Sequence, residues 1–492
     1  MRDAFAPSPR AVAVAAPPGR PAQPENHTMN PEDIRLLVTA LASVLGLVAL
    51  IVSRPKLHPL LALLIVSMAV GLATGMPLGK LASAISGGAG KTLGAVGLVV
   101  ALGAMLGKLL ADSGVTDSVA NAIVSRASRK ALPWAMTGVA FIIGIPMFFE
   151  VGLVVMLPLI FGVARKLEAE NPGEGSPYIY VGVPVIAALA AMHGMVPPHP
   201  GPLTAIATLK TSVGATMLYG FVAAIPAIVL AGPIYGNFLA PRMKVRPDDA
   251  LVAQYAPHGD DHGTGAAVQK SPPGLGLGLL TALLPALLML LNALGEMLLD
   301  KGSALLHVAA FIGNPIVAML LGVVFAVIVL RPGQPEAVRK ALSDSVKPVA
   351  NVLLIIAGGG AFQQVLTDAH VGDAIVHMSH QLALSPLLLG WLISMLLSVS
   401  TGSATVGIVG AAGLLAPLAA SGVAVNQPLL ALAIGCGSLF FNYANHAGFW
   451  LVKESFGMSM GEATKTISVV QSIVAVVGLV MVLLLNLLPP LA

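Results

Sequence analysis

The chain has 492 residues, of which 56% are apolar and only 10% are charged. A typical soluble protein has about 25% charged residues, and it could not hide this much apolar surface, so soluble globular and disordered classes are excluded. The single cysteine, Cys436, excludes a disulfide framework and cysteine-based metal centres, and a net charge of +4 does not indicate a nucleic-acid partner.

Residues 1–30 are rich in Pro and Ala and predict a disordered N-terminal tail, with Met29 as an alternative start to Met1. A series of runs that are apolar on every face follows between residues 34 and 489. Several are long enough to cross a bilayer, which takes about 20 residues. The sequence therefore predicts an all-α polytopic membrane protein with two transmembrane repeats, over 31–240 and 273–492. The segment 241–272 between them predicts a polar linker loop, and its His and Asp residues favour a solvated loop over a metal site.

Clusters of Lys and Arg separate the apolar runs and predict which loops face the cytoplasm. With all of them on that side, the run at 93–111 points inward and its counterpart at 348–366 points outward, which predicts inverted repeats. The clusters are Arg54/Lys56, Arg126/Arg129/Lys130, Arg165/Lys166, Arg242/Lys244/Arg246 and Arg331/Arg339/Lys340.

Two groups of charges stand out in the first repeat. Lys108 and Asp112 are four residues apart, which places them on one helix face and favours a structural ion pair. Glu150 is the only charge from 131 to 164. Because a carboxylate in an apolar span is costly and by default functional, we predict that Glu150 carries coupling protons. The alternative is a carboxylate at the end of a span that reaches the lipid headgroups.

The stretch His193–Thr204 contains four prolines between two apolar segments. Proline removes a backbone donor and interrupts a helix, and unwound backbone in a membrane requires protein or a water-filled cavity around it. A helix beginning near Thr204 would complete a site for an anion or hydroxyl group. A surface loop is the alternative. The predicted substrate-binding residues here are His193, Pro198, His199, Gly201 and Thr204.

Three segments in the second repeat carry further candidates. Gly358–Gly360 predicts a flexible break. Gly402, Ser403 and Thr405 offer hydroxyls and broken-helix carbonyls for a substrate or ion, with close helix packing as an equal alternative. The segment 442–450 follows an apolar run and carries amides and an imidazole that suit sugar hydroxyls, while Trp450 is equally explained as an interfacial anchor. Its candidates are Asn442, Asn445 and His446.

The two halves resemble each other weakly and in the same order. Asp112 aligns with Asp368, Glu150 with Thr405, and His199 with His446. Secondary transporters are often built from such repeats, with substrate near the midplane on interrupted helices.

Taken together, these segments resemble the gluconate permease family of bacterial proton symporters, from about Pro31 to Leu488. The resemblance implies a multi-pass inner-membrane carrier with interrupted helices and re-entrant hairpins. It implies uptake of gluconate or a related sugar acid or hydroxy acid with protons, without a cofactor or metal, and it leaves a homodimer open. Its motifs are Gly103–Gly114, Phe149–Gly152, His193–Pro202, Gly359–Phe362, Gly402–Thr405 and Gly448–Trp450.

The chain departs from the family at three positions. The family usually carries Lys, Arg and Asp where this chain has Gln363, Ser398 and His446. If Arg and Asp pair in relatives, losing both leaves no unpaired buried charge. Alternatives are therefore a different ligand, such as a hydroxy amino acid or another carboxylate, and sodium coupling. A membrane-embedded enzyme is remote, because neither a nucleophile with a base nor a metal-binding spacing occurs. A channel would need charge rings or repeated filter loops.

Overall fold

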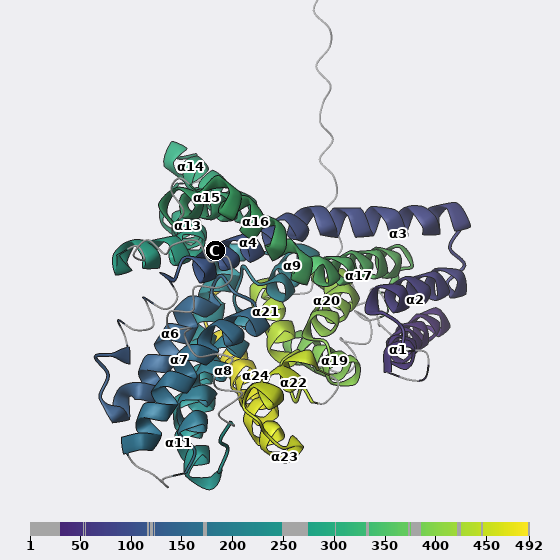
Figure 1. The fold of residues 1–492 in the computed structure, drawn as a ribbon. Helices are drawn as coiled ribbons and strands as arrows, with labels where there is room; N and C mark the ends of the chain where they lie inside the picture. The colour runs from purple at the N-terminus through teal and green to yellow at the C-terminus, as the bar shows by residue number, and fades with distance from the viewer. Residues whose placement is uncertain are drawn as a thin grey trace, which may run out of the picture.

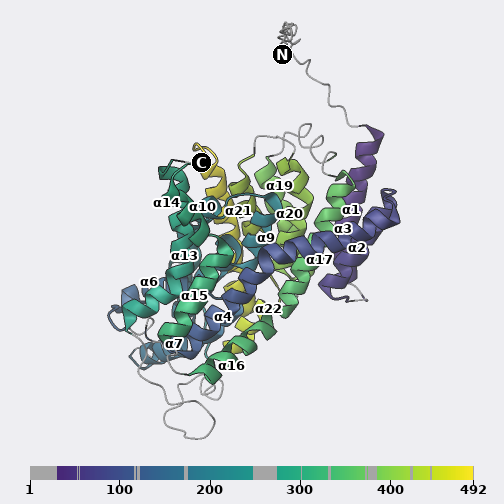
Figure 2. The same ribbon diagram turned by 90° about the horizontal axis from the view of Figure 1, so that it is seen from above.

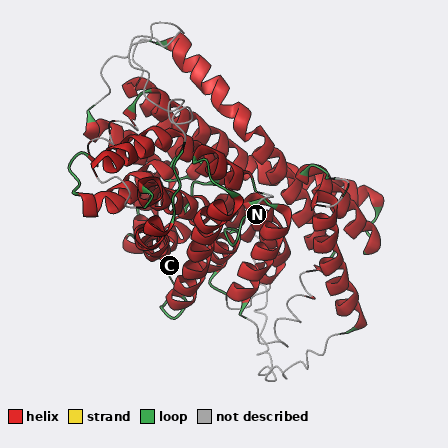
Figure 3. Cartoon of the chain, turned by 60° about the horizontal axis from the view of Figure 1, so that its bottom comes forward, coloured by secondary structure: helices red, strands yellow, loops and turns green. Residues whose placement is uncertain are grey.

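The computed structural model describes residues 30–490 with several gaps. In this part of the chain every regular element is a helix and no strand occurs (Figure 3), which confirms the predicted all-α class. The predicted tail, apart from Asn30, and most of the predicted linker loop lie outside the described residues. The gaps are 53, 55, 116–117, 119–121, 123, 171–174, 248–273, 301, 331–333, 372–373, 375–384, 421–424 and 444–445.

The N-terminal half opens with two helices and then a long rod, in which α3 continues into α4 through one π-helical turn. Its helices are α1 (Pro31–Val52), α2 (Pro59–Ala73), α3 (Leu78–Thr92), α4 (Leu98–Asp112), α6 (Leu132–Gly144), α7 (Phe149–Glu170), α8 (Pro177–Met195), α9 (Pro200–Leu209), α10 (Val213–Val229) and α11 (Tyr235–Leu239).

The C-terminal half opens with three apolar helices and an amphipathic one. Its helices are α13 (Leu275–Leu298), α14 (Ala304–Ile312), α15 (Pro315–Leu330), α16 (Pro335–Val346), α17 (Ala350–Asp368), α19 (Pro386–Thr401), α20 (Ala404–Ala420), α21 (Gln427–Gly437), α22 (Ala447–Ser455), α23 (Met460–Ala463) and α24 (Val469–Leu485).

The two halves interlock in space. Helices α1, α2 and α3 lie at one side of the molecule with α17, and α6 and α7 lie at the other (Figures 1 and 2). Between them, α9 of the first half packs against α20 and α21 of the second half, and α20 also packs against α17. The centre of the molecule is therefore built from both halves.

Six helical segments among the described residues are long and apolar enough to cross a membrane. One is the 35-residue rod of α3 and α4, and another is the 33-residue segment from Pro177 to Leu209. Helices α14 and α15 form a further candidate span that is bent by 66°. Helices α19, α20 and α21 have 10–17 residues, which is short for a hydrocarbon core of about 30 Å. Short helices of this kind fit the predicted interrupted elements.

The three residue pairs of the sequence repeat occupy matching positions in the fold. Asp112 and Asp368 are the last residues of α4 and α17. Glu150 and Thr405 are the second residues of α7 and α20. His199 and His446 are the N-caps of α9 and α22. The two halves therefore share an order of elements, and the inverted orientation of the repeats stays a prediction.

The glycine triplet Gly358–Gly360 does not break a helix, because α17 continues through it to Asp368. A Cβ atom at Gly360 would overlap the Gly88 carbonyl oxygen of α3. A Cβ atom at Gly359 would overlap the Val409 side chain of α20. The prediction of a flexible break was wrong, since these glycines instead let α17 cross two neighbours at close range.

Candidate functional site

The proline-rich stretch interrupts one apolar span over four residues. Helix α8 ends at Met195 and α9 begins at Pro200, so Val196–His199 form the first break. The sequence predicted that α9 starts near Thr204, whereas the helix begins four residues earlier, at Pro200. Prolines are tolerated there because the N–H groups of a first helical turn have no intrahelical acceptor. Pro198 lies in the break and is buried.

His199 ties the first break to the end of α6. Its side chain is 3% exposed, and its Nε2 atom lies 2.7 Å from the Gly144 carbonyl oxygen. Its ring lies 5.6 Å from that of His193 and 6.2 Å from that of Phe148, both measured between centroids. The Nδ1 atoms of His193 and His199 are buried and have no hydrogen-bond partner among the described residues. Buried polar atoms normally have a hydrogen-bond partner, so these two nitrogens are available to bind a ligand.

Glu150 lies in the first turn of α7, immediately after the segment that joins α6 to α7. Its side chain is half-buried. The carboxylate is close enough to the imidazoles of His193 and His446 for electrostatic interaction. The structure thus brings together the predicted proton carrier and one predicted histidine from each half of the chain.

The second break, residues 438–446, separates α21 from α22. Its His446 side chain caps α22, because Nδ1 accepts a hydrogen bond of 3.0 Å from the Gly448 N–H. A Cβ atom at Gly448 would lie 3.1 Å from the Phe149 ring. Helix α22 therefore begins against the start of α7, next to Glu150. Asn445 lies outside the described residues.

Asn442 is held in a network of hydroxyl groups. The Ser398 hydroxyl of α19 donates to the Ser438 carbonyl oxygen at 2.6 Å, and its oxygen lies 3.2 Å from Asn442 Oδ1. The Asn442 amide also donates to Ser438 O at 3.3 Å, and the Ser468 hydroxyl donates to Asn442 O at 2.6 Å. This neutral network stands where the family resemblance implied an arginine at position 398.

The remaining candidates lie around the contact between α9 and α20. Gly402 adopts a φ of 70° at the end of α19, and the Ser403 hydroxyl accepts from the Val406 N–H at 3.3 Å. Gly201 lacks a side chain where a Cβ atom would overlap Ile408. The Thr204 hydroxyl donates to Pro200 O at 2.7 Å, and Thr405 is half-buried.

Gln363 is one of the three positions at which the chain differs from the family. It lies on α17, apart from Ser398 and His446. A Cβ atom at Gly413 of α20 would lie 3.3 Å from the Gln363 Cβ atom, so the Gln363 side chain packs against that helix.

The predicted ion pair of Lys108 and Asp112 is confirmed, with Nζ 2.7 Å from Oδ1. Within the described residues, no group of three or more His, Cys, Asp or Glu side chains is placed to hold a metal ion.

Sequence reasoning missed two features of this region. One is the hydroxyl network, although Ser438 and Ser468 lie in otherwise apolar runs and could have been singled out for that reason. The other is a cavity of about 700 Å³ that is lined by Glu150 together with residues of α4, α16 and α22. No periodicity in the sequence places α4 and α16 beside Glu150.

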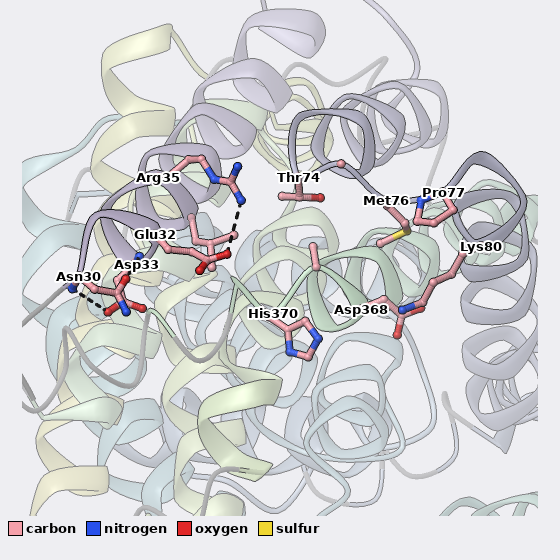
Figure 4. Close-up of a pocket in the computed structure, with 13 residues that line it drawn as sticks. Asn30, Glu32, Asp33, Arg35, Thr74, Met76, Pro77, Lys80, Asp368 and His370 are labelled. Carbon is pink, nitrogen blue, oxygen red and sulfur yellow. Dashed lines mark hydrogen bonds and ion pairs between the residues drawn. The ribbon is translucent and has the colours of Figure 1, made fainter. Parts of the chain in front are cut away.

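A second, polar pocket of about 480 Å³ lies where the start of α1, the turn between α2 and α3, and the end of α17 meet (Figure 4). Arg35 pairs there with Glu32 at 3.6 Å, and Lys80 and Asp368 line the opposite wall. None of the predicted site residues lines this pocket, so it is separate from the region around Glu150.

Comparison with solved structures shows the fold. The YdaH transporter of Alcanivorax borkumensis superposes with a TM-score of 0.61 at 15% identity, covering 92% of this chain and 99% of that chain.

Comparison with known sequences shows the family. The model of the GntP family permease matches residues 35–488. The gluconate permease of Pseudomonas aeruginosa is 39% identical, over 92% of this chain and 98% of its own length. The high-affinity gluconate transporter of Escherichia coli is 40% identical, over 92% and 99%. A D-serine transporter of Escherichia coli is 32% identical, over 90% and 97%. The chain therefore belongs to the GntP permease family, and it is a multi-pass membrane transport protein and not an enzyme.

Proposed function

We propose that this permease takes up gluconate, or a related sugar acid or hydroxy acid, across the bacterial inner membrane together with protons. The observation that carries the proposal is that Glu150, at the start of α7, lies next to the start of α22 and within electrostatic range of His193 and His446, one imidazole from each half of the chain. The relatives named for gluconate, at 39% and 40% identity over nearly the whole chain, support the substrate class.

His193, in the last turn of α8, and His199, in the first break, supply the binding contacts in this proposal. The Nδ1 atoms of His193 and His199 have no partner among the described residues, and a polyhydroxy acid offers both donors and acceptors to them. The N-terminal turns of α9 and α22 add partial positive charge that suits a carboxylate. Gly402, Ser403 and Thr405 approach from the α19–α20 turn and complete the proposed site.

Coupling follows from charge. A deprotonated Glu150 repels a substrate carboxylate, and protonation removes that repulsion, so proton and anion bind cooperatively. Such a coupling is reciprocal: the bound anion favours a protonated Glu150 by the same factor. If the repeats 31–240 and 273–492 are inverted, alternating access is a rocking of repeat elements around this fixed site.

The second candidate substrate is a hydroxy amino acid. The D-serine transporter of Escherichia coli is 32% identical to this chain. The family's usual Lys, Arg and Asp are replaced here by Gln363, Ser398 and His446, which removes two cations and one anion. A zwitterion carries less net charge than a sugar acid, so it suits a site with fewer compensating charges.

Uptake into proteoliposomes decides between these candidates. Purified protein is reconstituted, and labelled gluconate or D-serine is offered with an imposed proton gradient or sodium gradient. We expect gluconate to accumulate only with the proton gradient and only in protein-containing vesicles. Accumulation of D-serine alone would favour the second candidate. Accumulation driven by sodium alone would contradict proton coupling.

A further inference from the structure

A cavity extends from Glu150 to α16, beyond the histidines of the site described above. It has a volume of about 700 Å³, within the range of about 300–1,000 Å³ that is usual for small-molecule pockets. Its wall includes Lys108 of α4, Glu150 of α7, Asp344 of α16 and Ala447 of α22. Because Ala447 directly follows His446, the cavity reaches from α16 to the proposed binding site. Helix α16 packs along α4 (Figure 2).

Lys108 is the one cation among the described residues that line this cavity. Its ammonium group donates to Asp112 Oδ1 at 2.7 Å, and an ammonium group has two further N–H donors. The Lys108 side chain is 42% exposed, so water and solutes in the cavity reach it. The other charge on the outer wall, Asp344, is already paired with Lys347 at 2.7 Å, and the hydrogen bond from Lys347 holds the pKa of Asp344 below its usual range.

We infer that this cavity is the cytoplasmic vestibule of the transport pathway and that the Lys108 ammonium group holds the substrate carboxylate there. The inference rests on the proposed transport of an anionic substrate. The rest of the wall is largely apolar, with Phe148, Val151 and Val154 among its residues, and the attraction between an ammonium group and an anion is stronger in such surroundings than in open water. Asp112 orients the lysine from the neighbouring turn of α4.

The basic residues of α16 predict which side of the membrane the cavity faces. This helix carries Arg339 and Lys340, part of a basic cluster that predicts a cytoplasmic position. In uptake, a substrate that leaves Glu150 would therefore pass Lys108 last. Charge attraction at the exit favours release of the anion from the central site and raises the local concentration available for exchange.

The first test measures the KM of gluconate from each side of the membrane, in right-side-out and inside-out vesicles. For Lys108→Gln we expect the KM from the cytoplasmic side to rise three- to tenfold, because a charge-assisted hydrogen bond is lost, while the KM from the other side stays within twofold. Lys108→Arg should restore the cytoplasmic KM. Lys91→Gln is the matched control, since Lys91 is exposed on α3 and does not line the cavity.

A folding defect is separated from this effect by cysteine labelling. Cys436 is the single cysteine and is buried, so an introduced cysteine is the accessible one. Ala104→Cys, which lines the cavity, should react with a charged, membrane-impermeant thiol reagent only from the cytoplasmic side, and gluconate should slow the reaction. Leu98→Cys is the control on the same helix, because Leu98 is outside the cavity and 56% exposed on the apolar surface.

The outcomes distinguish a failure of the proposed function from a failure of the role inferred for Lys108. If wild-type protein transports no sugar acid, the proposed function fails before Lys108 is tested. If wild type transports gluconate but Lys108→Gln leaves both KM values unchanged, Lys108 does not hold the substrate. If Ala104→Cys resists the charged reagent from both sides, the cavity is filled by lipid and is not a vestibule.

Discussion

The two broken helices at the centre of this permease are built in different ways. In the first break, His199 reaches across to α6 and bonds Gly144 O, and the Nδ1 atoms of His193 and His199 are left without partners in the described chain. In the second break, Asn442 is enclosed by Ser398, Ser438 and Ser468, and His446 bonds the first turn of its own helix.

This difference predicts that the first break binds the ligand and that the second break stabilises the fold. Open polar atoms can accept a ligand, whereas satisfied ones hold the backbone in place. We therefore expect substitutions in the first break to change transport more than stability. Substitutions in the second break should change stability first.

The largest expected effect is in the second break. Ser398→Arg places a charge in the network around Asn442, whose described hydrogen bonds join only neutral groups. We expect a loss of stability of about 3–5 kcal/mol, the range for an uncompensated buried charge, measured as a fall in melting temperature in detergent. Ser343→Arg, at an exposed position of the amphipathic helix α16, is the control.

Adding His446→Asp to Ser398→Arg tests whether the two family charges act as a pair. We expect the double variant to recover at least half of the lost stability. A double variant that is no more stable than Ser398→Arg alone would show that the two positions do not compensate each other.

The next effect belongs to the first break. His193→Gln removes a nitrogen that we assign to the substrate. A hydrogen bond to a charged group contributes about 1.5–3 kcal/mol, so kcat/KM for gluconate should fall roughly 10- to 100-fold. The melting temperature should change little, because the Nδ1 atom of His193 has no hydrogen-bond partner within the described chain. His307→Gln, at an exposed position of α14, should leave transport unchanged, and an equal loss there would refute the assignment.

The smallest effect concerns the close crossing of α3 and α17. A Cβ atom at Gly88 would overlap Gly360 O, whereas one at Gly90 meets nothing within 4 Å. Gly88→Ala should destabilise by about 1–3 kcal/mol through overpacking. Gly90→Ala should stabilise by about 0.5–1 kcal/mol through helix propensity. Equal melting temperatures for the two variants would contradict the close crossing of α3 and α17.

The sequence predicted the elements that local chemistry dictates. Prolines at 197–202 predicted an interruption, and the weak repeat paired Glu150 with Thr405 and His199 with His446, which occupy matching helix positions. What it could not supply depends on long-range packing. Gly358–Gly360 was interpreted as flexible because the sequence does not show that α3 and α20 cross there.

The cavity beside Glu150 was missed for the same reason. It is formed by α4 and α16, whose residues are more than two hundred positions apart in the sequence. The start of α9 was predicted four residues too far along the chain. Prolines in the first turn of a helix cannot be told from prolines that break a helix by sequence alone.

The central claim is that Glu150 couples protons to substrate where the two breaks meet. Its most direct test is Glu150→Gln in proteoliposomes, with Glu296→Gln on the exposed face of α13 as the control. We predict that Glu150→Gln loses accumulation driven by a proton gradient but keeps exchange of labelled for unlabelled gluconate, because an uncharged side chain still admits the anion. Glu296→Gln should behave as wild type. Accumulation at the wild-type level by Glu150→Gln would contradict the account.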